Sequence, residues 1–215
     1  MMAEFIRARS VEQKQLRMNE IMETTDKLFS NHTYHEITLT TIAEALNWSR
    51  GNLYKYVTTK EEIFLELYLE QQQNYFNNVK AVFANSTDFT METFAELWTT
   101  KLDKHRDYLR YYGILVTIIE TNVTVERLAE FKKSVMIGLN EVITILEKYC
   151  GIAHDEAAEL FWTFIFHACG LNNSCNLNPL IKEAMKMAEI PELNLDFVQN
   201  LNKFVLMCLR NYMKE

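Results

Sequence analysis

The chain has 215 residues, of which 48% are hydrophobic and 24% are charged. This balance excludes intrinsic disorder for most of the chain, and the length is sufficient for one or two domains with a sizeable core. Five glycines and two prolines are too few for the turns of a β-rich protein or the loops of a nucleotide-binding α/β fold, so an all-α fold is favoured. The net charge of −7 argues against indiscriminate nucleic-acid binding.

The first predicted element is a helix over residues 10–30. Ser10 and Gln13 match a capping box, and apolar residues follow at helical spacing. After a polar break, Thr38 is suited to cap a short second helix. The apolar face of that helix repeats at i, i+3, i+4 and i+7 and consists of Leu39, Ile42, Ala43 and Leu46.

A sharp three-residue turn that begins at Asn47 separates the second helix from a third one over residues 49–56. Asn47 tolerates the left-handed backbone that ends a helix, and Ser49 is suited to cap the next helix. Thr59 with Glu62 forms another capping box, which opens a long fourth helix. Two short helices joined by a tight turn and braced by a longer one are typical of a helix-turn-helix unit, whose second helix enters the DNA major groove.

The charge of this unit differs from that of the rest of the chain. Residues 1–60 hold eight basic and seven acidic residues, whereas the remainder has an excess of eight acids. No acid occurs between Glu44 and Glu61, a stretch that holds three bases. A basic stretch in an acidic protein predicts a site for an anion. The outward face of the third helix offers donors suited to phosphates and base edges, namely Arg50, Asn52, Lys55 and Tyr56.

The motif that runs to Leu67 is specific, with Gly-Asn-Leu-Tyr at 51–54 followed by Thr-Lys-Glu at 59–61. It resembles the DNA-binding domain of the tetracycline-repressor (TetR/AcrR) family of bacterial transcriptional regulators. Three residues depart from the family pattern. Thr33 replaces a usual glycine and Val57 a usual aromatic residue, and both changes concern packing. Trp48 replaces a smaller residue, and it either contacts the DNA backbone or packs inside the unit.

The resemblance implies DNA contacts from nine residues. Arg50, Asn52 and Lys55 are the expected base readers. Gly51 permits close approach of the backbone, and the other contacts are expected to reach phosphates. The full set is Thr38, Ser49, Arg50, Gly51, Asn52, Tyr54, Lys55, Tyr56 and Lys60. Residues alone leave packing of Tyr54 in the core as an alternative.

The rest of the chain predicts further helices. Their expected ranges are 90–119 in two pieces, 124–149, 155–172, 178–188 and 194–213. Breaks are expected at 85–88, at Thr121-Asn122, at Cys150-Gly151, from Asn172 to Pro179 and at Pro191. We therefore expect two domains, a DNA-binding domain over 1–60 and a helical effector-binding and dimerisation domain over 61–215.

A single recognition helix with few bases binds DNA weakly, so a homodimer on a palindromic site is expected. The segment 157–171 is apolar on nearly every face, and 194–213 carries an apolar stripe. Two such helices from each subunit suit a four-helix interface, which the resemblance also implies. The expected interface residues are Phe161, Ile165, Phe197, Leu201, Phe204 and Cys208. The alternative is that both stripes belong to the core of one protomer.

The middle helices are rich in aromatic residues, which by themselves indicate a packed core. The resemblance implies a cavity for a small effector among them, with polar side chains that orient it. The expected lining is His105, Tyr108, Tyr112, Phe131, Asn140, Trp162, Phe166 and His167. The effector would favour a conformer whose recognition helices no longer match successive major grooves, and the helix from Thr59 would transmit the change.

Three readings of function follow. The first is a repressor that a small molecule releases from DNA; the second keeps DNA binding but gives the large domain a protein partner. The third is an enzyme, which we do not expect because the chain lacks HExxH, GxSxG and phosphate-loop motifs.

No cofactor is expected, and His167, Cys169 and Cys175 are a poor set of ligands for zinc. No segment is apolar enough to suggest a signal peptide or a membrane span, so a soluble cytoplasmic protein is expected.

Overall fold

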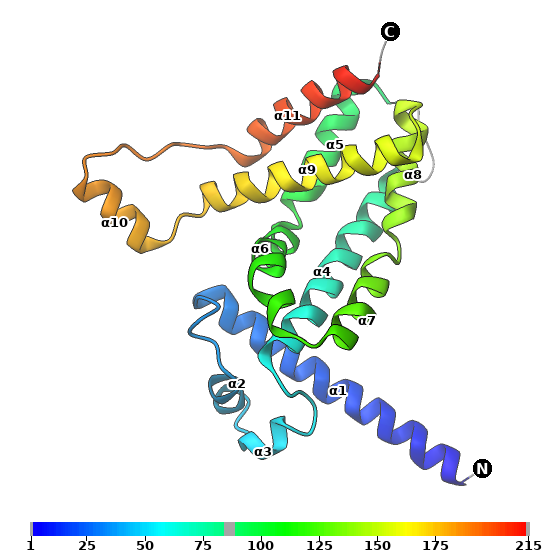
Figure 1. The fold of residues 1–215 in the computed structure, drawn as a ribbon, viewed down its shortest axis with the longest axis vertical. Helices are drawn as coiled ribbons and strands as arrows, with labels where there is room; N and C mark the ends of the chain where they lie inside the picture. The colour runs from blue at the N-terminus through cyan, green and yellow to red at the C-terminus, as the bar shows by residue number, and fades with distance from the viewer. Residues whose placement is uncertain (1, 84–88, 214–215) are drawn as a thin grey trace.

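The computed structural model describes residues 2–83 and 89–213, with side chains from residue 12 onwards. Every element in these ranges is helical, which confirms the predicted all-α fold. The N-terminal unit consists of α1 (Met2–Asn31), α2 (Leu39–Ala45) and α3 (Arg50–Leu53). The long helix α4 (Lys60–Phe83) then runs from this unit into the rest of the protein (Figure 1).

The larger part of the chain packs around α4. It contains α5 (Met91–Asp103), α6 (Arg106–Ile114), a π-helical segment η1 (Leu115–Ile119), a 3-10 turn η2 (Glu120–Asn122), α7 (Val125–Val135), α8 (Leu139–Cys150), α9 (His154–Cys175), α10 (Pro179–Met187) and α11 (Phe197–Tyr212). Helices α9 and α11 lie against each other and against α5 and α6. Helix α10 projects sideways from the ends of α9 and α11 (Figure 1). None of the described helices is both long and apolar enough to cross a membrane.

Side-chain caps define the helix-turn-helix unit, as the sequence predicts. The Thr38 hydroxyl accepts from the Thr41 N–H at 3.1 Å, and the Thr41 hydroxyl accepts from the Thr38 N–H at 2.9 Å. Asn47 adopts the left-handed conformation with φ 55°. The Ser49 hydroxyl then accepts from the Asn52 N–H at 3.2 Å. Because each short helix satisfies its own orphan N–H groups, both hold their shape with few residues.

The capping box at α4 differs slightly from the expected one. The Thr59 hydroxyl accepts from the Glu62 N–H at 3.3 Å, but the Glu62 carboxylate turns back to the N–H and hydroxyl of Thr58. These bonds lower the pKa of Glu62 against the opposing effect of its burial, which is the largest single influence. The turn between α3 and α4 is therefore closed by hydrogen bonds from both sides.

Several predicted boundaries are wrong. Helix α1 begins at Met2, so Ser10 lies within it and does not cap it. Helix α3 ends at Leu53, and the residues to Tyr56 continue as turns. Helix α9 continues to Cys175, past the break expected at Asn172, because Asn172 is buried in the bundle. The break expected at Asn85–Asp88 lies outside the described residues.

The helix predicted over 124–149 is two helices. Gly138 has φ +79°, a conformation that residues with a side chain rarely adopt, and it separates α7 from α8. The turn redirects the chain so that Phe131 on α7 and Leu139 on α8 both reach the core.

Two glycines allow a matched test of this turn. We expect Gly138→Ala to lower the free energy of unfolding by about 1 kcal/mol, because alanine pays for the left-handed backbone. Gly170→Ala should raise it by about 0.5–1 kcal/mol, because Gly170 lies inside α9 and a Cβ there meets nothing within 4 Å. Urea denaturation of the two variants measures both values. If both substitutions changed the free energy of unfolding in the same direction, the special role of the Gly138 turn would be contradicted.

Candidate DNA interface and its connection to the large domain

The expected recognition helix is anchored by one apolar residue. Leu53 is fully buried, whereas Arg50, Gly51, Tyr54 and Lys55 are exposed. Tyr54 is 54% exposed, so its alternative reading as a core residue is wrong. Asn52 and Tyr56 are half-buried, and Thr38 and Ser49 are exposed at the N-termini of α2 and α3. Both helices lie at the end of the molecule farthest from α11 (Figure 1).

Trp48 packs against its own unit. Its ring lies 5.7 Å from the ring of Tyr56, and the Arg17 guanidinium from α1 lies over it at 5.5 Å. The half-buried indole therefore ties α1 to the end of α3. This contact favours the packing reading of Trp48 over a DNA-backbone contact, because the face of the ring is already covered.

Lys60 has a different environment from the one expected. Its ammonium donates two hydrogen bonds of 2.7 Å, to the carbonyl oxygens of Tyr34 and Ile37, and lies 3.8 Å from the centre of the Tyr34 ring. Burial is the main cause that lowers the pKa of Lys60. Two of its three N–H groups thus hold the loop between α1 and α2, which leaves one N–H of this half-buried ammonium for the expected phosphate contact.

The neighbouring Tyr34 strengthens this anchor. Its hydroxyl makes a short hydrogen bond to the Glu61 carboxylate, and burial together with that bond raises its pKa. Tyr34 also packs edge-on against Phe64, one turn farther along α4. The sequence contains no local signal for these contacts, because their partners lie about 25 residues apart in the chain.

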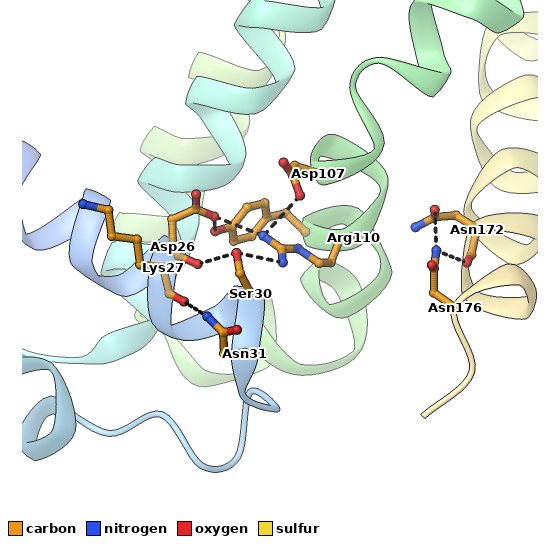
Figure 2. Close-up of polar contacts among 9 residues, drawn as sticks. Asp26, Lys27, Ser30, Asn31, Asp107, Arg110, Asn172 and Asn176 are labelled. Atoms are coloured by element: carbon orange, nitrogen blue, oxygen red, sulfur yellow. Dashed lines mark hydrogen bonds and ion pairs between the residues drawn. The ribbon is translucent and has the colours of Figure 1, made fainter. Parts of the chain in front are cut away.

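A polar cluster connects α1 to α6 and thereby the small unit to the large one. The Arg110 guanidinium lies 3.1 Å from the Asp26 carboxylate and 3.2 Å from that of Asp107 (Figure 2). The Tyr111 hydroxyl donates to the same Asp26 oxygen at 2.5 Å. Burial, and then the bond to Asp26, raises the pKa of Tyr111. The guanidinium also covers the Phe29 ring at 4.6 Å, so α1 and α6 share polar and apolar contacts.

Most of the expected effector residues join one aromatic cluster in the large domain. The ring centre of Tyr68 on α4 lies within 6.3 Å of the ring centres of three of them, Tyr108, Tyr112 and Phe131. Trp162 and Phe166 extend the cluster from Tyr112, and His105 borders it through Tyr75. Three further members, Tyr68, Gln72 and Tyr75, were not predicted, although their i, i+4, i+7 spacing places them on one face of α4.

Two expected effector residues lie apart from that cluster, and one is at its surface. Asn140 is exposed at the start of α8. His167 stacks on Phe204 of α11, with ring centres 3.7 Å apart, and burial lowers its pKa. Phe166 is 58% exposed. The three were expected in a cavity that the family resemblance implies, but the orientation of their helices directs Asn140 and Phe166 outward.

The cluster contains buried hydroxyl groups that lack well-formed hydrogen bonds. Tyr75 and Tyr108 are fully buried and stacked, with ring centres 5.3 Å apart. In the described part of the chain the Tyr75 hydroxyl has no hydrogen-bond partner, and the Tyr108 hydroxyl lies close to Tyr68 and Gln72 without a well-formed hydrogen bond. The Gln72 amide donates to the Tyr68 hydroxyl at 3.2 Å. Gln72 also lines a cleft of about 470 Å³ between α1, α4 and α7. Unsatisfied buried hydroxyls cost free energy, so they mark the polar part of this core as a candidate ligand site.

The expected dimer residues are mostly inside the protomer. Phe161, Ile165 and Leu201 have no exposed area, and Phe197 is buried under the Arg106 guanidinium. These four therefore cannot meet a second subunit, and the alternative reading as core applies to them. The reason is that α9 and α11 pack on α5 and α6, which uses their most apolar faces. Phe204 and Cys208 remain half-buried.

Comparison with known proteins agrees with this architecture. Residues 21–67 match the family described as "Bacterial regulatory proteins, tetR family". Residues 69–212 match "Tetracyclin repressor-like, C-terminal domain". The chain belongs to the TetR family. This TetR-family member is thus a transcriptional regulator with an N-terminal DNA-binding helix-turn-helix domain and a helical C-terminal domain.

Solved TetR-fold structures resemble the whole chain. The fatty acid degradation regulator FadR from Bacillus halodurans is 15% identical, with a TM-score of 0.57, and the match covers 90% of this chain and 94% of that one. FadR from Bacillus subtilis, solved in complex with stearoyl-CoA, is 16% identical with a TM-score of 0.54, covering 88% and 96%. At these identities the likeness concerns the fold. No curated protein matches the sequence.

The role of Lys60 in this TetR-family fold is open to a direct test. Lys60→Ala should lower the free energy of unfolding by about 1–2 kcal/mol, because two loop carbonyls lose a charged donor. The control Lys55→Ala removes an exposed lysine nearby and should stay within about 0.5 kcal/mol of the wild type. Denaturant unfolding distinguishes them, and equal stabilities would show that the anchor is unimportant.

The connection between α1 and α6 is measurable by a double-mutant cycle. Asp26→Ala and Arg110→Ala should show a coupling energy of about 1 kcal/mol, because the pair is partly buried. The exposed pair Arg17–Glu20 serves as the control cycle and should give at most about 0.5 kcal/mol. A coupling no greater than the control would mean that the contact is incidental.

Proposed function

We propose that this protein is a homodimeric repressor that binds a palindromic operator and that a small-molecule effector releases it from DNA. The observation that carries the DNA-binding part is the capped α2–α3 pair with its exposed donors. Both helices are held by their own caps, and Lys60 fixes the unit to α4. A unit that is rigid before binding presents its donors without a further ordering cost.

The proposed DNA contacts come from the exposed and half-exposed residues of this pair. Arg50, Asn52 and Lys55 read base edges, because guanidinium, amide and ammonium groups match the major-groove pattern. Gly51 allows α3 to approach closely. The hydroxyls of Thr38, Ser49, Tyr54 and Tyr56 serve the phosphates. Lys60 supports this surface through its two loop carbonyls, and its remaining N–H serves a phosphate.

For the remaining assignments, we propose a DNA-binding domain over 1–60 and an effector-binding and dimerisation domain over 61–215. The dimer surface would use the parts of α9 and α11 that the protomer leaves accessible. Phe204 and Cys208 are half-buried there, and Phe166 and Met207 are exposed. A palindromic site needs two such subunits, because symmetry in the protein mirrors symmetry in the DNA.

The effector proposal is supported by the polar part of the aromatic core. The hydroxyls of Tyr75 and Tyr108, which lack well-formed hydrogen bonds, are suited to donate to a ligand. A phenol is protonated at neutral pH, and burial raises the pKa of Tyr75 further. Gln72, which donates to the Tyr68 hydroxyl of this core, also lines the open cleft between α1, α4 and α7. Bacillus subtilis FadR, which shares the fold, was solved with stearoyl-CoA, so this fold accommodates an effector of that class in at least one protein.

The alternative is a regulator whose large domain binds a protein. One observation favours it: α10 projects from the bundle and exposes apolar side chains, with Leu180 at 78% and Met187 at 80%. Exposed apolar patches mark interaction surfaces. The two interpretations differ in whether a small molecule changes the affinity for DNA. The ligand screen described below measures that change.

Selection of bound sequences from a random DNA pool tests the proposal. Enrichment of a palindrome is expected for the wild type. Asn52→Ala should relax the preference at one base position in each half-site and cost about 1–3 kcal/mol per contact, with an unchanged melting temperature. Failure to enrich any sequence would overturn DNA reading by α3.

The selected operator then reports on the effector. Small molecules, with stearoyl-CoA among the first, are screened for release of the labelled operator. A coupling of about 1–3 kcal/mol corresponds to a 5- to 150-fold loss of affinity. If ligands bind the protein but leave the operator affinity unchanged, the small-molecule reading is wrong and the protein-partner reading gains.

A further inference from the structure

A second cationic surface lies beside the recognition helix, on α1. A groove of about 640 Å³ is lined by residues 13–20 in the middle of α1 and by two residues of the turn after α3. Its basic side chains are Lys14 and Arg17 from α1 and Lys55 from the turn. Tyr56 borders it with a half-exposed phenol, and Glu20 is the acid in its lining. We call this surface the α1–α3 groove.

The position of the groove suits a long polyanion. Helix α1 has 30 residues, and its N-terminal part extends away from the bundle at the end of the molecule that carries α2 and α3 (Figure 1). Lys55 and Tyr56 belong both to the groove and to the proposed recognition surface. The groove is therefore continuous with that surface, and a strand of DNA that leaves one reaches the other.

The charges of the groove are available to an anion. Lys14 and Lys55 are exposed. Arg17 pairs with Glu20 at 2.7 Å, but both side chains are about half exposed, and such a surface ion pair contributes little. The Arg17 guanidinium is also held over Trp48, so it is positioned before any ligand arrives. Three bases against one acid attract phosphate, and the pre-positioned guanidinium is suited to bind it through two hydrogen bonds.

We propose that the α1–α3 groove binds the phosphate backbone of DNA next to the major groove that α3 enters, with Lys14 and Arg17 as the contacts. This inference rests on the proposed DNA-binding function and extends its surface to α1. The contact is independent of base identity, so it adds affinity and orientation without changing the sequence that is read.

The test measures the affinity for the selected operator as a function of salt concentration. Each lost phosphate contact should reduce the slope of log K against log salt by about 0.9, and by about 1.8 for a dimer with two grooves. Lys14→Ala should therefore lose about eightfold in affinity per contact near 0.1 M salt. Lys14→Glu should lose more, because it adds repulsion. The base preferences of both variants should equal those of the wild type.

Controls separate this inference from the proposed function. Lys148→Ala removes an exposed lysine on α8 in the large domain and should leave slope and affinity unchanged. Asn52→Ala should change base preference with little effect on the slope. Arg17→Lys should keep the salt slope close to that of the wild type, whereas Arg17→Ala should reduce it by about 0.9 per lost contact. Thermal melting shows that each variant is folded.

Two results would overturn the inference. Wild-type slopes in Lys14→Ala and Arg17→Ala, with operator binding intact, would show that the groove does not touch DNA while the proposed function stands. Absence of operator binding by the wild type would reject the proposed function and this inference together. A protein that binds inorganic phosphate in the groove but shows no slope change on DNA would indicate a site for a small anion instead.

Discussion

The ammonium group of Lys60 holds the small helical unit against the helix on which the large domain is built. Its two hydrogen bonds close the loop after α1, and its own helix α4 continues for 24 residues into the core. A lysine suits this position because an ammonium has three N–H groups and therefore donates to both loop carbonyls at once. The orientation of α2 and α3 follows from it, since both are attached between that loop and α4. Any displacement at the start of α4 is therefore carried directly to the recognition helix.

A second connection joins Asp26 of α1 to Arg110 and Tyr111 of α6 (Figure 2). Helix α6 carries Arg110 and Tyr111 and also Tyr108, which belongs to the aromatic core. One short helix thus touches both the candidate effector region and α1. A ligand that changed the packing around Tyr108 would therefore act on α6 and, through it, on the Asp26 contacts. This is a physical route for coupling that needs no change within α2 or α3.

The core explains why the apolar stripes of α9 and α11 were misassigned. Both helices were expected to face a second subunit, yet Phe161, Ile165 and Leu201 are completely buried in one protomer. A helix that is apolar on nearly every face contacts several neighbours, and the pattern alone does not say which of them belong to the same chain. The apolar side chains that α9 and α11 leave accessible include Phe166 and Met207, and Phe204 is half-buried. The same ambiguity affected the effector residues, since aromatic side chains line cores and cavities alike.

Local chemistry in the sequence determined the all-α fold, the helix-turn-helix unit and its caps at Thr38, Ser49 and Thr59, because a cap depends on residues three positions apart. The motif also identified the family and the outward donors of α3. Tertiary structure decided the rest. It directed Lys60 inward to carbonyls 23 and 26 residues away, joined Asp26 to Arg110 across 84 residues, and placed Lys14 and Arg17 beside Lys55. Tertiary structure likewise decided the left-handed turn at Gly138, which separates α7 from α8 where one helix was predicted. Helix periodicity tells which side chains share a face, but only the packing of one helix on another decides what that face meets.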